Sequence, residues 1–126
     1  LKEKGAKKAV MLNVGGPFHS PAMKNASEEL KKALESVRWH RGKGKVVSNV
    51  TAVLTDDPDE IRNNLIEQLS HPVLWMQSMQ RLVSEGYMQY IEAGPGSVLK
   101  GLFRAIEKNA RVFSVAKPGD IVTLKG

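Results

Sequence analysis

With 126 residues, 41% of them hydrophobic, the chain is long enough for one core, and because it has no cysteine, disulfides and thiolate metal sites are excluded. No apolar run approaches the roughly 18 residues of a membrane span, and the first residues lack the apolar stretch of a signal peptide, so we expect a cytoplasmic protein without a membrane partner. The net charge of +6 favours anionic partners, but the densest basic cluster, Arg41–Lys45, has no interleaved aromatic residues, so we expect no nucleic acid partner.

The first residues have the pattern of a helix end followed by a strand. Leu1–Lys4 resembles the last turn of a helix, and Gly5 would close that helix because its backbone is permissive. The chain is therefore expected to start inside a larger protein. The apolar segment Lys8–Val14 runs into Gly15-Gly16-Pro17, which predicts a strand entering a turn.

A helix is predicted over about residues 21 to 37. Ser20 can serve as its N-cap, and Pro21 is the residue best tolerated at the first helical position. Apolar residues then recur at helical spacing through the segment. His19 is therefore expected at a junction between a strand and a helix.

The middle of the chain predicts one strand and two helices. Lys45–Leu54 is rich in valine and threonine, which favours a strand, with Val46-Val47 buried on both faces. Asp57–Glu60 offers an N-cap, a first-turn proline and an acid at the third helical position. The helix that follows is expected to end before Pro72, and a second apolar stripe predicts a helix closed by Gly86.

The last third repeats the alternation of strand and helix. Tyr87–Glu92 is a strand candidate, Gly94-Pro95-Gly96 turns it into a helix over 98–106, and Arg111–Val115 forms a last strand. Lys117–Asp120 has the composition of a turn into a loose tail. This alternation predicts an α/β fold with a largely parallel sheet.

Three motifs carry a resemblance to a known family. The motifs are Gly15–Met23, Gln68–Trp75 and Glu92–Leu102. In order and spacing they resemble the C-terminal half of malonyl-CoA:acyl carrier protein transacylases and polyketide-synthase acyltransferase domains. The serine nucleophile of that family lies upstream, in a Gly-x-Ser-x-Gly elbow, and the present sequence contains no such elbow. The resemblance therefore implies a segment that carries the base of the enzyme without its nucleophile.

The resemblance also implies the domain organisation and the reaction. Residues 1–16 would end a small ferredoxin-like subdomain, 17–116 would form the C-terminal part of a large hydrolase-like subdomain with a parallel sheet, and 117–126 would be a tail. The family transfers a malonyl group from coenzyme A to the pantetheine thiol of acyl carrier protein by a ping-pong Ser-His mechanism, in fatty acid or polyketide biosynthesis. A non-catalytic remnant that binds acyl carrier protein or a neighbouring domain through its basic face is the alternative.

The resemblance assigns roles to three residues. His19 matches the general base, and an imidazole suits that role because its ordinary pKa lies near neutrality. Gln68 matches the residue whose backbone carbonyl orients the base. Phe18 matches a position associated with acyl selectivity. Without the resemblance, His19 could be a histidine satisfied by a carbonyl, Gln68 a polar residue near a helix end, and Phe18 a core aromatic.

The remaining motifs predict no further chemistry. Gly94-Pro95-Gly96 lies before a helix, but the dinucleotide and P-loop patterns fail downstream of it, so it is interpreted as a tight turn. His40 and His71 lack companions at metal-ligand spacing, and no metal is expected. No cofactor is expected either, because coenzyme A enters as the thioester substrate.

Overall fold

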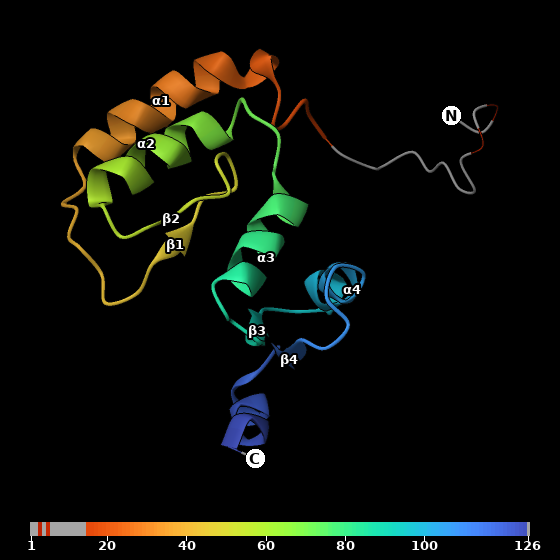
Figure 1. Cartoon of the computed structure of the whole chain (residues 1–126). Coiled ribbons are helices and arrows are strands. Elements are labelled where there is room, and N and C mark those ends of the chain that lie inside the picture. Colours follow the sequence, from red (N-terminus) through yellow and green to blue (C-terminus); the bar gives the residue numbers. More distant parts are fainter. Residues whose placement is uncertain (1–2, 4, 6–14, 126) are drawn as a thin grey trace.

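The fold is given by a computed structural model that describes residues 3, 5 and 15–125 (Figure 1). Its elements are the 3-10 helix η2 (Pro21–Met23), α1 (Lys24–Glu35), β1 (Val46–Val47), β2 (Leu54–Thr55), α2 (Pro58–Gln68), α3 (Trp75–Ser84), β3 (Gln89–Ala93), α4 (Val98–Arg104), β4 (Arg111–Val115) and the 3-10 helix η3 (Pro118–Lys125). The strand expected over Lys8–Val14 lies outside the described residues, and so does most of the helix end expected over Leu1–Lys4. The division into subdomains at residue 16 stays a prediction.

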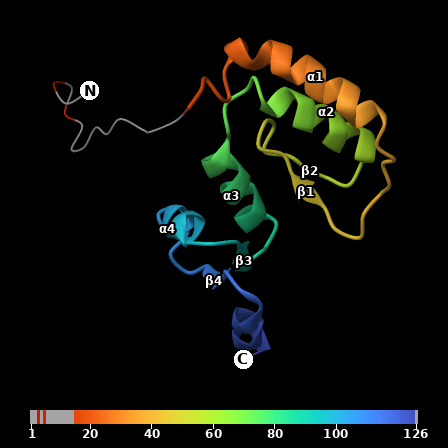
Figure 2. The same cartoon turned by 180° about the vertical axis from the view of Figure 1, so that it is seen from behind.

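Helices α1 and α2 pack side by side, as both views of the chain show (Figures 1 and 2). The predicted cap of α2 is confirmed, because the Asp57 carboxylate accepts hydrogen bonds from the backbone N–H groups of Asp59 at 2.8 Å and Glu60 at 3.3 Å. These bonds satisfy donors that the first turn of a helix leaves without partners. The acid at Glu60 has a different partner from the one a capping box requires, since it accepts a bond from the Thr55 hydroxyl.

The single strand predicted over Lys45–Leu54 is wrong. The structure has two short antiparallel strands here, β1 and β2, joined by a tight loop. Ser48 explains the reversal: its hydroxyl accepts the Val50 N–H at 3.2 Å, and its backbone binds both Ala52 and Val53. Such side-chain bonds to the local backbone compete with a straight strand. Val46 is exposed rather than buried on both faces.

The C-terminal elements form a strand-helix-strand unit. Strands β3 and β4 are parallel, with Gln89 opposite Arg111 and Ala93 opposite Val115, and α4 connects them. Helix α3 precedes this unit and is closed by Gly86, whose φ of 88° is in the left-handed region that glycine enters without strain. The predicted parallel sheet is therefore present at this pair, whereas β1 and β2 form a separate antiparallel pair.

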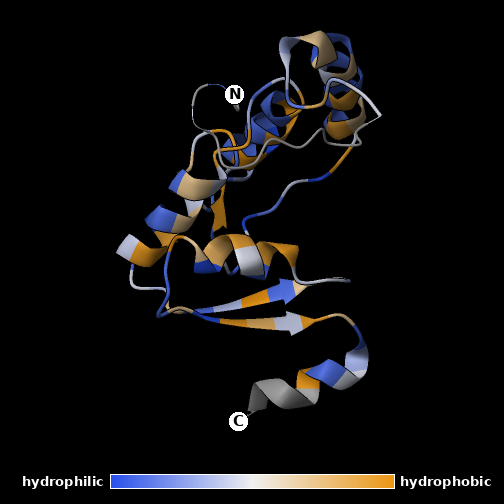
Figure 3. Ribbon diagram, turned by 90° about the vertical axis from the view of Figure 1, so that its right-hand side faces the viewer, coloured by the Kyte–Doolittle hydropathy of each residue, from blue (hydrophilic) through white to orange (hydrophobic). Residues whose placement is uncertain are grey.

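The apolar core lies on one side of the β3–β4 pair. Figure 3 shows α4 along that side, and the buried apolar residues of the described chain are Met79, Phe103 and Ala110. Partly buried residues of α3, of both strands and of the segment after α4 surround them. Ile91 points to the other face of β3 and is 58% exposed. Ile91 on that face is thus left largely uncovered by the residues that the structure describes.

The segment after β4 differs from the predicted loose tail. It forms η3, and the Asp120 carboxylate begins this turn by accepting the backbone N–H groups of Ala116 at 2.9 Å and Lys117 at 3.1 Å. A short polar side chain that binds nearby N–H groups is enough to order such a turn.

The loop between β1 and β2 makes hydrogen bonds to the residues at the start of α3. The N–H of Leu74 donates to the Asn49 carbonyl at 2.8 Å, and the fully buried Ser78 hydroxyl lies 3.5 Å from the Ser48 carbonyl. The start of α3 is therefore fixed on this loop. No helix in the described part of the chain is both long and apolar enough to cross a membrane.

Candidate active site

His19 lies two residues before η2 and has an unusual backbone conformation. Its φ is 59°, in the left-handed region that few residues other than glycine adopt, although histidine enters it more readily than most. Its N–H donates to the carbonyl of Leu69 at 3.0 Å. Such a conformation costs about 1 to 3 kcal/mol and persists where surrounding contacts impose it. The end of α2 supplies those contacts.

The His19 ring is held by the residue next to Leu69. Its Nδ1 lies 2.8 Å from the backbone oxygen of Gln68, 49 residues away in sequence. A carbonyl oxygen can only accept, so Nδ1 carries the proton, and in the neutral ring the lone pair is on Nε2. Nε2 makes no hydrogen bond to the residues that the structure describes, and the side chain is exposed. The ring therefore presents a proton acceptor to solvent.

The Gln68 side chain contributes little to this arrangement. Its Nε2 lies 3.4 Å from the same Nδ1 of His19. Both nitrogens are donors once Nδ1 is protonated, so this contact is not a hydrogen bond. The structure thus brings the predicted base and the predicted orienting carbonyl together, and it does so through the main chain of Gln68.

The end of α2 explains why carbonyls are available here. The last carbonyls of an α-helix lack partners within the helix. At the end of α2, Glu67 O accepts from Ser70 N at 3.1 Å and from His71 Nδ1 at 2.8 Å, while the next two carbonyls bind His19. His71 also lies 3.2 Å from the Glu67 carboxylate. All three terminal carbonyls therefore have partners, and His19 is the partner of two of them.

Two residues of this site were not predicted. The Leu69 carbonyl binds the His19 backbone, and the Ser20 hydroxyl donates to the Pro17 carbonyl at 2.7 Å instead of capping the helix. The expected N-cap role of the Ser20 side chain is therefore wrong. The left-handed conformation of His19, which no sequence pattern indicated, accounts for both contacts because it turns the chain sharply between Pro17 and Ser20.

Phe18 lies beside the base on the surface. It is 58% exposed, so within the described chain it is not the core aromatic that was the alternative interpretation. Its ring folds back over Gly16, where a Cβ atom would lie 3.4 Å from Phe18 Cε2. A large apolar ring is thus presented next to His19.

A carboxylate of the protein binds the backbone donors that follow the Gly94-Pro95-Gly96 turn. The Glu92 carboxylate accepts the backbone N–H of Leu99 at 2.9 Å and that of Lys100 at 3.2 Å, at the start of α4. These are the donors that a phosphate would need at a helix N-terminus. The interpretation as a tight turn therefore agrees with the structure, which shows φ angles of 136° and 95° at the two glycines.

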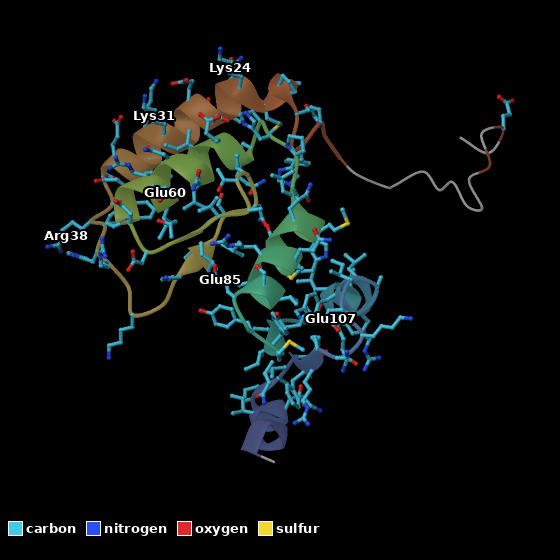
Figure 4. The ribbon with its side chains drawn as sticks, viewed as in Figure 1. Lys24, Lys31, Arg38, Glu60, Glu85 and Glu107 are labelled. Atoms are coloured by element: carbon cyan, nitrogen blue, oxygen red, sulfur yellow. The ribbon has the colours of Figure 1, made fainter. Side chains whose placement is uncertain are left out.

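The other described titratable residues that touch one another form ion pairs of two side chains each. No group of three His, Asp or Glu side chains is placed to hold a metal among the residues that the structure describes. Part of the positive charge lies on α1, where Lys24 and Lys31 point away from α2, and Arg38 follows the helix end (Figure 4). In the basic loop, Arg41 pairs with Asp56 at 3.2 Å.

Comparison with known proteins shows what this chain is similar to. A malonyl CoA-acyl carrier protein transacylase of Bacillus subtilis is 41% identical over 120 residues, which are 95% of this chain and 38% of the relative. Over almost its whole length this chain is therefore similar to part of a malonyl CoA-acyl carrier protein transacylase. A Staphylococcus aureus transacylase is 36% identical over the same length, and the resemblance inferred from the three motifs is confirmed. No family model matches the chain.

Solved transacylase structures show the same fold. The acyl-carrier-protein S-malonyltransferase of Burkholderia pseudomallei superposes with a TM-score of 0.90 at 39% identity, over 98% of this chain and 40% of that one. A malonyl-transacylase solved in complex with a type II polyketide acyl carrier protein gives 0.89 at 33% identity, over 97% of this chain and 40% of that one. The α/β fold class is confirmed, and the chain spans about two fifths of the length of these transacylases.

Proposed function

We propose that this chain supplies the general base of an acyltransferase that moves a malonyl group from coenzyme A to the pantetheine thiol of acyl carrier protein. The 2.8 Å contact between His19 Nδ1 and the Gln68 carbonyl carries the proposal. It leaves Nε2 of the neutral ring free to take the proton of a serine hydroxyl and give it to the leaving coenzyme A thiolate. In the second half-reaction Nε2 takes the proton of the carrier thiol and returns it to the serine oxygen. Related transacylases at 41% and 36% identity support the choice of reaction.

In this mechanism His19 acts as the base and Gln68 orients it. A carbonyl fixes the tautomer and the ring direction as an aspartate would, without adding a negative charge. Phe18 would limit the size of the acyl group beside the base. A difference of one methyl group is worth about 1 to 3 kcal/mol, so Phe18 would bias the enzyme toward malonyl without making the choice absolute.

The nucleophile would come from residues outside this sequence, which contains no Gly-x-Ser-x-Gly elbow. The chain alone would therefore form no acyl-enzyme. Its substrates would be malonyl-CoA and acyl carrier protein, it would need no metal or other cofactor, and it would act in the cytoplasm in fatty acid or polyketide synthesis. The missing elbow also favours a second candidate, a non-catalytic module that binds acyl carrier protein through its basic surface.

A chimera separates the two candidates. Residues of the Bacillus subtilis transacylase that match this chain are replaced by the chain itself, and malonyl transfer to acyl carrier protein is measured. Transfer that is lost in His19→Asn supports the catalytic role. A folded chimera that binds the carrier protein without transferring malonyl would favour the binding module and contradict the proposal.

A further inference from the structure

The Ser20 hydroxyl forms its hydrogen bond with a preceding residue and not with η2, the helix that Ser20 precedes. It donates to the Pro17 carbonyl at 2.7 Å, three residues back, and makes no cap bond to η2. This bond closes a turn that contains His19, the residue before Ser20, and the φ of His19 is 59°. We propose that Ser20 is a positioning residue for His19, a role that rests on the proposed function and refines it.

The left-handed conformation is what allows His19 to reach two carbonyls at once. The backbone N–H of His19 binds Leu69 O at 3.0 Å, and the ring Nδ1 binds Gln68 O at 2.8 Å. These acceptors belong to adjacent residues at the end of one helix. An extended backbone at His19 would direct the N–H and the ring differently, and one of the two bonds would be lost.

Ser20 connects this turn to the packed helices α1 and α2. Its carbonyl accepts the N–H of Met23 at 3.0 Å, which begins η2, and η2 leads directly into α1. Helix α1 packs on α2, and α2 carries the two carbonyls. The contacts thus form a closed ring from α2 through His19, Ser20 and α1 back to α2. Within that ring of contacts, the Ser20 hydroxyl closes the turn through its bond to the Pro17 carbonyl. The other end of the turn is constrained because the pyrrolidine ring fixes the φ of Pro17.

The test reads the ring nitrogens of His19 by NMR in the full 126-residue chain with 15N-labelled histidine. His19→Asn assigns the signals. The variant Ser20→Ala removes the hydroxyl, and Ser20→Thr retains one. Ser36→Ala is the matched control, because the Ser36 hydroxyl makes the same bond three residues back, to Ala33 O at 2.8 Å, at the other end of α1.

We expect wild-type His19 to be protonated at Nδ1 when the ring is neutral. In Ser20→Ala the ratio of the Nδ1–H to the Nε2–H form should fall about fivefold, which equals about 1 kcal/mol, the usual net worth of a neutral hydrogen bond. Exchange of the His19 backbone N–H should accelerate by a similar factor. Ser20→Thr and Ser36→Ala should resemble the wild type in both measurements.

Several results would overturn the proposal. They are an unchanged tautomer ratio and amide exchange in folded Ser20→Ala, an equal change in Ser36→Ala, or an Nε2–H ring in the wild type. If Ser20→Ala does not fold, Ser20→Val is compared with Ser20→Thr. Valine has the shape of threonine, with a methyl group in place of the hydroxyl. Unfolding of the valine variant as well would assign Ser20 to stability and reject the positioning role. A chimera that fails to transfer malonyl while the NMR signature persists would contradict the proposed function alone.

Discussion

Replacement of His19 should remove most of the acyl transfer of the chimera, and the choice of substitute matters. Alanine would add backbone strain to the loss of the base, because the position has a φ of 59°. Asparagine tolerates the left-handed conformation and cannot act as a base at neutral pH. His19→Asn therefore isolates the chemistry. General-base assistance contributes about 10² to 10⁴ in rate, or about 2.7 to 5.4 kcal/mol, and kcat/KM should fall by that factor.

Gln68→Ala should have a much smaller effect. The substitution keeps the carbonyl that lies 2.8 Å from His19 Nδ1 and removes an amide whose 3.4 Å contact with Nδ1 joins two donors. We expect a loss of less than about tenfold, since no hydrogen bond of the side chain to the base is removed. Gln77→Ala on the exposed side of α3 and His40→Asn, at another exposed histidine, serve as matched controls.

The assay is single-turnover malonylation of the chimera followed by transfer to acyl carrier protein, from pH 6 to 8. Circular dichroism of each variant verifies that it is folded. Two results would refute the reasoning: near-normal acylation by His19→Asn over this pH range, or a folded Gln68→Ala variant as damaged as His19→Asn. The first result would show that His19 is not the general base, and the second would show that the Gln68 side chain acts on His19.

Four further outcomes follow from the structure. Incubated alone with malonyl-CoA, the chain should show no malonyl adduct by intact mass spectrometry, and an adduct that turns over to carrier protein would contradict the assignment of the nucleophile to another segment. Because Ile91 is 58% exposed on the open sheet face, the chain should associate with rising concentration in sedimentation experiments, and Ile91→Lys should reduce this association; a stable monomer in both forms would refute it. Asp57→Ala should lower the free energy of unfolding by about 0.5 to 2 kcal/mol in denaturant titrations, since it removes the acceptor of two N–H groups at the start of α2, and an unchanged midpoint would contradict the capping role. Burial, with a smaller contribution from Glu107, raises the pKa of Tyr90, so the folded state holds this proton more tightly and should lose stability as the pH rises above 10; Tyr90→Phe should lack that part of the loss, and an identical pH profile would contradict it.

Local patterns in the sequence predicted most of the helices and strands. The cap at Asp57, the closing glycine at Gly86 and the strand Arg111–Val115 all lie where their residue types indicated. These signals act over a few residues, so the physics that sets them is present in the sequence itself. The β1–β2 hairpin was missed because its loop reverses at Ala52, with a φ of 56°, and alanine is not a residue that indicates such a turn.

The site depended on contacts that no local pattern records. His19 and Gln68 could be paired only through the family resemblance, because they are 49 residues apart and the acceptor is a main-chain atom. The hydroxyl of Ser20 was assigned to the helix because serine before proline is the usual cap pattern, and the turn at His19 redirected it. The Glu92 carboxylate at the start of α4 was also missed, although an acid that ends a strand before a Gly-Pro-Gly turn is a usable signal for such a contact.

The contact between α3 and the β1–β2 loop makes the geometry of the base sensitive to a distant position. The segment after α2 is anchored at Leu74 by the Asn49 carbonyl, and Ser78, one turn further along α3, is completely buried against the same loop. A larger side chain at Ser78 would push α3 off the loop and pull on the segment that bears the Gln68 and Leu69 carbonyls. In the chimera such a variant should lose turnover because the carbonyls that hold His19 would be displaced. Loss of activity in variants of this region should therefore not be taken as evidence that the replaced residue contacts a substrate.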